Sequence, residues 1–230
     1  MPYSLQETPE AVILSPQVEA SAAVIWLHGL GADGHDFVPI VDELRLPSSL
    51  AVRFVFPHAR PRPVTINNGF VMRAWYDITG FGPERTEDEQ GIRESEDVVC
   101  KLVEKEMSAG IKSQRVVIAG FSQGGAIALH TGLRYPQRLA GIMALSTYLP
   151  LAGSVAKEAS PANRDVPILM CHGLRDGIVP VALGAASRDA LQSLGYRLQW
   201  ESYPMEHQVC MEEIADISEW LQQVLRPVTT

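Results

Sequence analysis

The chain has 230 residues, 46% of them hydrophobic and 20% charged, which is typical of a globular protein, and we expect one domain over residues 1–230. Its formal net charge of −8 disfavours partners that present phosphate backbones or anionic lipid, so we expect no binding to nucleic acid. Three widely spaced cysteines predict reduced thiols rather than disulfides or a metal site. The sequence has neither a leader-like start nor ~18 continuous apolar residues, which predicts a cytoplasmic protein without a membrane span.

Six short apolar segments predict buried strands. Most are continuous and rich in β-branched residues rather than alternating, which is typical of strands covered on both faces. Their ranges are 22–29, 52–57, 115–121, 139–146, 166–173 and 196–204. Apolar residues with helical spacing occur between them at 88–109 and near the C-terminus at 214–224. This alternation predicts an α/β fold in which a mostly parallel central sheet has helices on both faces, with the ligand site beyond the carboxyl ends of the strands.

The segment after the first of these strands allows two interpretations. Residues 29–34 read Gly-Leu-Gly-Ala-Asp-Gly, which matches the glycine pattern of dinucleotide-binding sites. Such a site needs an acidic residue at the end of the second strand, yet residues 47–63 contain neither Asp nor Glu. We therefore expect no cofactor, although the arginines of that stretch leave a phosphorylated nucleotide as an open alternative.

Residues 57–85 follow the second predicted strand and have no clear periodicity. The stretch is rich in proline, glycine and other loop-forming residues. We expect a long irregular loop here, and long loops of this kind are often functional.

Residues 120–124 read Gly-Phe-Ser-Gln-Gly and lie between a predicted strand and residues 126–133, which predict a helix. This is the context of a nucleophile elbow, the tight turn that presents a reactive serine. The turn strains the serine backbone, so the residues two positions away on either side must be small. The motif indicates Ser122 as a nucleophile, and the plainer alternative is a glycine-rich turn with an incidental serine.

A serine nucleophile needs a histidine base and an acid that orients it, and in this type of fold they follow in the order serine, acid, histidine. Of the six histidines, only His172 and His207 come after Ser122 and outside its helix. His172 would need an acid that precedes its strand. His207 lies just beyond the last predicted strand, and Asp176 lies in the loop after the preceding one, so we predict Ser122, Asp176 and His207 as catalytic. A surface histidine and an ordinary Asp-Gly turn are the alternatives.

Two backbone amides are expected to stabilise the oxyanion. One belongs to Gln123, the residue after the nucleophile, and the other to the loop after an early strand. Residues 28–31 form such a loop, and its Leu30 amide is the expected second donor.

These motifs resemble those of the carboxylesterase and acyl-protein thioesterase family of α/β-hydrolases. The resemblance covers nearly the whole chain. It rests on HGLGADG (28–34), WYD (75–77), DEQGI (88–92), GFSQGG (120–125), HGLRDGIVP (172–180) and YPMEH (203–207) with a following Glu-Glu pair.

The resemblance implies an α/β-hydrolase fold and a small esterase that forms a serine acyl-enzyme without metal or cofactor. It implies short- to medium-chain acyl esters or thioesters as substrates, and association into a homodimer. Ser122, Asp176 and His207 match the family's triad, and Leu30 and Gln123 match its oxyanion donors. By the same resemblance Trp75 borders the acyl pocket, and the alternative is an aromatic side chain packed under a loop.

One position departs from the family pattern, which usually has a small residue before the triad histidine. Here that residue is Glu206. We hypothesise that a carboxylate beside His207 favours the imidazolium form and alters the pH profile.

Three functions remain open from the sequence. The first is a carboxylesterase on short- to medium-chain esters. The second is an acyl-protein thioesterase or lysophospholipase on longer chains. The third is a binding protein that keeps the fold without catalysis, which is disfavoured because serine, acid, histidine and both oxyanion segments occur together.

Overall fold

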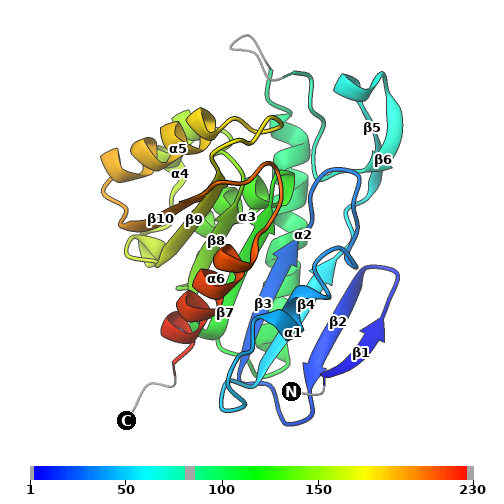
Figure 1. Ribbon diagram of the computed structural model, residues 1–230, viewed down its shortest axis with the longest axis vertical. Coiled ribbons are helices and arrows are strands. Elements are labelled where there is room, and N and C mark those ends of the chain that lie inside the picture. Colours follow the sequence, from blue (N-terminus) through cyan, green and yellow to red (C-terminus); the bar gives the residue numbers. More distant parts are fainter. Residues whose placement is uncertain (1–2, 81–85, 227–230) are drawn as a thin grey trace.

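The computed structural model describes residues 3–80 and 86–226 of the chain. An eight-stranded sheet has the strand order β1-β2-β4-β3-β7-β8-β9-β10, from right to left in Figure 1. Its strands are β1 (Tyr3–Glu7), β2 (Ala11–Pro16), β3 (Ala22–Leu27), β4 (Val52–Pro57), β7 (Val116–Phe121), β8 (Gly141–Leu145), β9 (Ile168–Gly173) and β10 (Leu198–Tyr203).

The six predicted strands are confirmed, and neighbouring ones pair in parallel. Strands β1 and β2 were not predicted, and they add an antiparallel edge next to β4. Parallel strands have their carboxyl ends at the same edge of the sheet. The loops after β3, β7, β9 and β10 therefore meet there, as the sequence indicates.

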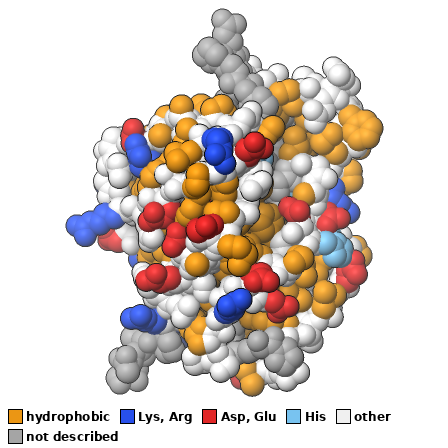
Figure 2. Space-filling view, in the orientation of Figure 1, with side chains coloured by type: hydrophobic (Ala, Val, Ile, Leu, Met, Phe, Trp, Pro, Cys, Tyr) orange, Lys and Arg blue, Asp and Glu red, His pale blue; other side chains and the backbone are white. Residues whose placement is uncertain are grey.

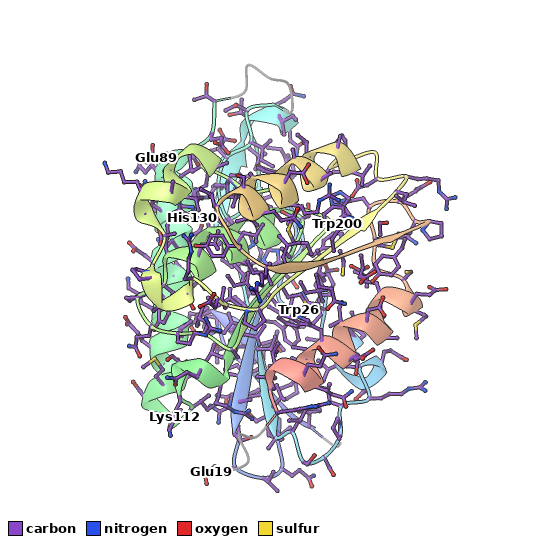
Figure 3. All side chains as sticks on the ribbon, turned by 90° about the vertical axis from the view of Figure 1, so that its left-hand side faces the viewer. Glu19, Trp26, Glu89, Lys112, His130 and Trp200 are labelled. Carbon is purple, nitrogen blue, oxygen red and sulfur yellow. The ribbon has the colours of Figure 1, made fainter. Side chains whose placement is uncertain are left out.

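Helices cover both faces of the sheet. They are α1 (Ile40–Glu43), α2 (Glu89–Ser108), α3 (Gln123–Arg134), α4 (Val155–Glu158), α5 (Val181–Ser193) and α6 (Met211–Val224). Apolar residues of α2, α3, α4 and α5 share one core with the sheet, whereas those of α1 and α6 share the other. Figure 3 shows this from the side, with Glu89 of α2 and His130 of α3 on one side of the sheet and α6 on the other.

Strand β3 explains why most of the predicted strands are continuous apolar runs. All six of its residues are buried, and their side chains point alternately to the two cores. Ile25 and Leu27 pack with the α2 and α3 side, whereas Val24 and Trp26 pack with the α6 side. A strand covered on both faces has no solvent side, so it has no polar alternation.

The expectation of an irregular stretch at 57–85 is partly wrong. Strands β5 (Pro61–Val64) and β6 (Phe70–Arg73) form a separate antiparallel hairpin, and a short 3-10 turn, Thr65–Asn67, links them. The hairpin stands apart from the main sheet in Figure 1, and its Phe70 and Val71 are 68% and 59% exposed. Figure 2 shows hydrophobic side chains gathered over the same part of the molecule. Residues 81–85, the end of the predicted loop, lie outside the described residues.

Within the described ranges, none of the helices has both the length and the apolar character needed to cross a membrane. The same ranges hold no group of three or more His, Cys, Asp or Glu side chains arranged to bind a metal ion.

Candidate active site

Ser122 lies in the tight turn between β7 and α3. Its backbone has φ 54° and ψ −120°, a conformation that residues other than glycine rarely adopt. Its amide donates to the Leu145 carbonyl at 2.8 Å, which ties the turn to β8. A Cβ at Gly120 would lie 2.2 Å from the Gly124 carbonyl oxygen, and one at Gly124 would lie 2.4 Å from the Leu27 carbonyl oxygen. Close backbone approach therefore requires both glycines, and the local geometry is that of a nucleophile elbow.

The structure brings together the three residues expected to be catalytic. His207 Nε2 lies 2.9 Å from Ser122 Oγ, and His207 Nδ1 lies 2.7 Å from Asp176 Oδ2. A carboxylate only accepts hydrogen bonds, so Nδ1 carries a proton and Nε2 is free to accept the serine proton. The ring is thereby held in the tautomer that a general base needs.

Asp176 is fixed by its own loop. Its side chain is fully buried, and Oδ1 accepts from the amides of Ile178 and Val179 at 2.9 and 2.8 Å. The other oxygen, Oδ2, is left for His207. The Asp-Gly turn considered as an alternative thus exists, and it also aims the carboxylate at the histidine.

The two segments predicted to supply the oxyanion amides both lie next to Ser122. A Cβ at Gly29 would lie 3.5 Å from Ser122 Cβ, so the loop after β3 touches the elbow directly. The amide of Leu30, the next residue, makes no hydrogen bond to another described residue. Gln123 is the first residue of α3, where an amide has no acceptor within the helix. Two backbone donors are therefore available beside Ser122.

The side chain of Gln123 has a structural task that was not predicted. It is 3% exposed, Oε1 accepts from the Trp75 amide at 2.8 Å, and Nε2 donates to the Tyr76 carbonyl at 2.7 Å. The residue predicted to supply an oxyanion amide thus also fixes the segment after β6. The sequence motif does not reveal this role, because a glutamine side chain at this position could equally well be exposed to solvent.

Trp75 lies beneath the loop after β3. It is 2% exposed, and its indole Nε1 donates to the His28 carbonyl at 2.9 Å. The Ser95 hydroxyl donates to the Trp75 carbonyl. These bonds match the alternative of an aromatic packed under a loop, and its contact with an acyl chain stays a prediction.

His28 is a structural histidine. Its Nε2 accepts from the Ala59 amide at 3.0 Å, so the proton resides on Nδ1, which donates to the Gly29 carbonyl at 2.7 Å. Burial lowers the pKa of His28 to about 4, which keeps the ring neutral. Residues 29–34 then continue through turns to the four-residue α1 rather than opening a long helix. The helix N-terminus on which a dinucleotide site depends does not follow this segment.

His172, the other candidate base, supports the loop after β9 that carries Asp176, here called the acid loop. Its Nε2 donates to the Val179 carbonyl at 2.8 Å and lies 3.6 Å from Asp176 Oδ2. Burial lowers the pKa of His172, which favours the neutral ring. Its ring stacks on Trp200 of β10 at 6.0 Å between centroids. Figure 3 labels Trp200 on that strand.

Glu206 precedes His207 in the loop between β10 and α6, and its side chain is exposed. A Cβ at Gly173 would lie 2.3 Å from the Glu206 carbonyl oxygen, so the end of β9 packs directly against this loop. The effect of the Glu206 carboxylate on His207 stays a prediction.

Comparisons with known proteins place the chain among esterases and thioesterases. Residues 8–225 match the family model described as phospholipase/carboxylesterase. The chain is 38% identical to acyl-protein thioesterase 1 of Gibberella zeae over 216 residues, which cover 90% of this chain and 92% of that protein. It is 41% identical to acyl-protein thioesterase 1 of Neurospora crassa over 217 residues, with 90% and 89% covered.

Solved structures agree with this placement. The Arabidopsis thaliana SOBER1 structure superposes with a TM-score of 0.85 at 31% identity, covering 89% of this chain and 99% of that one. Zea mays acyl-protein thioesterase 2 gives a TM-score of 0.83 at 30% identity, with 93% and 97% covered. The Bacillus cereus carboxylesterase, at 17% identity and a TM-score of 0.74 with 93% of each chain covered, shares the fold.

Proposed function

This chain belongs to the phospholipase/carboxylesterase family of α/β-hydrolases, and from that premise we propose that it hydrolyses acyl thioesters and esters through Ser122, His207 and Asp176. The observation that carries the proposal is the continuous hydrogen-bonded line from Ser122 Oγ through His207 to Asp176, at 2.9 and 2.7 Å. The strained backbone of Ser122 supports it, because strain of this kind is typical of functional positions.

In the proposed reaction, His207 Nε2 takes the proton of the Ser122 hydroxyl as the oxygen attacks the acyl carbonyl carbon. The amides of Leu30 and Gln123 donate to the oxyanion that develops. Asp176 keeps the ring oriented and stabilises the imidazolium. His207 then protonates the leaving thiolate or alkoxide, and a water activated by the same ring hydrolyses the acyl-enzyme.

Substrate choice rests on the relatives. Those at 37–41% identity are named acyl-protein thioesterase 1, which favours the second function above, an acyl-protein thioesterase on longer chains, over the short- to medium-chain esters first expected. The family model's description, phospholipase/carboxylesterase, supports short- to medium-chain esters or lysophospholipids as the second candidate. A homodimer, implied by the resemblance, is likewise a proposal, and sedimentation of the purified chain tests it.

The test compares hydrolysis of a palmitoyl-thioester peptide with that of p-nitrophenyl acetate, octanoate and palmitate. The matched pair of variants is Ser122→Ala and Ser193→Ala, since Ser193 is an exposed serine at the end of α5. We expect activity on the thioester, loss of at least about a thousandfold in Ser122→Ala, and full activity in Ser193→Ala. Equal activity in wild type and Ser122→Ala would refute the triad, and preference for acetate would establish the carboxylesterase function instead.

A further inference from the structure

A cavity of about 480 Å³ lies away from Ser122, between α2 and the loops at the edge of the sheet. Its walls are the turn before β2, the segment from the end of β4 to the start of β5, the end of β6 with Ala74 and Trp75, and one face of α2. Neither Ser122, His207 nor Asp176 lines it. Its volume is within the range of small-molecule sites.

The charge of this cavity is opposite to that of the chain. Five cationic side chains line it, against two carboxylates, Glu10 and Glu94, whereas the whole chain carries a net charge of −8. The cations are Arg60, Arg62, Arg73, Lys101 and Lys105. Such a local excess attracts anions even when the net charge is negative.

The hydrogen-bonding groups of the lining are mainly donors. His58 Nδ1 accepts from the Gly34 amide at 3.0 Å, so a neutral His58 ring carries its proton on Nε2. The Arg62 Nη atoms lie 3.8 Å from the Asp88 and Glu94 carboxylates, which is ion-pair range but beyond hydrogen-bond distance. The Arg62 side chain remains 21% exposed, so its guanidinium can still donate to an oxyanion.

Arg62 packs against the first turn of α2. A Cβ at Gly91 would lie 2.2 Å from Asp88 Oδ2 and 2.7 Å from Arg62 Nη1, so the guanidinium lies directly over this glycine. A planar guanidinium is suited to bind phosphate through two donors at once.

Part of the lining is apolar. Val98 and Leu102 lie one turn apart on the face of α2 that also carries Lys101 and Lys105, and Trp75 lines the same space. An uncharged acyl chain would offer no partner to the five cations, so a ligand with an anionic group complements the cavity better. A molecule with an anionic head and a short apolar part satisfies both regions.

We propose that this cavity binds a phosphate monoester with a short apolar substituent, held by Arg62 and the neighbouring cations at its head and by Val98, Leu102 and Trp75 at its tail. The proposed catalytic residues do not line the cavity, and Trp75, which does line it, donates to the His28 carbonyl at 2.9 Å. It is independent of the proposed hydrolase function, since it requires none of the three catalytic residues.

Isothermal titration calorimetry of the full chain with octyl phosphate tests the proposal. The variant Lys101→Gln/Lys105→Gln removes two exposed cations of the cavity, and Lys112→Gln/Lys157→Gln removes two exposed cations elsewhere, with the same change in net charge. Lys112 lies beyond the far end of α2 in Figure 3. We expect the cavity variant to weaken binding by about tenfold or more and the control by less than about twofold. Equal affinities of the two variants would overturn the proposal.

Two comparisons test the ligand chemistry and the place of binding. Octanol and inorganic phosphate are each expected to bind at least about tenfold more weakly than octyl phosphate, and equal binding of either would overturn the proposed class. Of the chain's four tryptophans, only Trp75 lines this cavity in the described ranges. The indole N–H resonance of Trp75 is identified in an NMR spectrum as the one missing from Trp75→Phe. We expect octyl phosphate to shift this resonance. A shift confined to the other indoles would refute this location.

Discussion

Replacing Glu213 by glutamine should make the protein more stable at neutral and alkaline pH. Glu213 lies in the first turn of α6 and is fully buried. Neither of its carboxylate oxygens accepts a hydrogen bond of standard geometry within the described part of the chain. Burial raises the pKa of Glu213 to about 8, and the negative charge of Asp216 acts in the same direction. The folded protein therefore holds this side chain protonated at neutral pH.

The size of the effect follows from proton linkage. In the unfolded chain the Glu213 carboxyl titrates near its ordinary value of 4.5. Between that pH and about 8, the folded state binds one more proton than the unfolded state, so the free energy of unfolding falls by about 1.4 kcal/mol per pH unit. The contribution of the Glu213 proton to the free energy of unfolding is thus fully present below about pH 4.5 and is lost as the pH rises through about 8. The total loss is about 5 kcal/mol.

Urea unfolding of wild type and Glu213→Gln from about pH 5.5 to about pH 8 measures this. Glutamine has nearly the same shape and does not ionise, so the difference between the two proteins isolates this one group. We expect wild type to lose about 3 kcal/mol relative to the variant over this range. Glu212→Gln, at the exposed neighbouring position, is the control and should follow wild type. Parallel pH dependences of wild type and Glu213→Gln would refute a buried, protonated carboxyl.

Three further changes test how the site is held. Gln123→Ala keeps the backbone amide but removes both hydrogen bonds to the segment after β6, so kcat/KM for ester hydrolysis should fall by about tenfold or more; an unchanged value would contradict this positioning role. His172→Phe removes the donor to the Val179 carbonyl and should lower the free energy of unfolding by about 1–3 kcal/mol together with kcat, whereas wild-type stability would show that the acid loop holds itself. Glu206→Gln should shift the acidic limb of the pH-rate profile to lower pH, because a carboxylate beside His207 favours the imidazolium, and a superimposable profile would reject that hypothesis.

Most of the strands that the sequence predicts are those covered on both faces of the sheet. Strands such as β3 and β9 are buried at every position and are mostly apolar because each lies between two cores. Strand β1 escaped prediction because four of its five residues are exposed and its sequence, YSLQE, has no continuous apolar run. The β5–β6 hairpin escaped because Pro61 and Pro63, which usually signal loops, lie in a strand that pairs on one side only.

The candidate site divides in a similar way. The order of serine, acid and histidine along the chain, with the sheet topology, indicates which side chains meet at the carboxyl edge. The roles of the Gln123 side chain and His172 depend on tertiary hydrogen bonds to Tyr76 and Val179. Those bonds have no local pattern, because their partners are backbone carbonyls and any residue type supplies one.

At Ser122 the requirements of stability and of the proposed activity conflict, because the backbone is strained and the side chain is the proposed nucleophile. Its φ of 54° and ψ of −120° are accessible to glycine without penalty, whereas serine in such a region costs about 1–3 kcal/mol. A glycine here would relieve that strain, and the proposed nucleophile would be lost with it. Screens that select only for thermal resistance would therefore enrich inactive chains at this position, so a stabilised form of this protein has to be sought at sites such as Glu213 that lie outside the elbow.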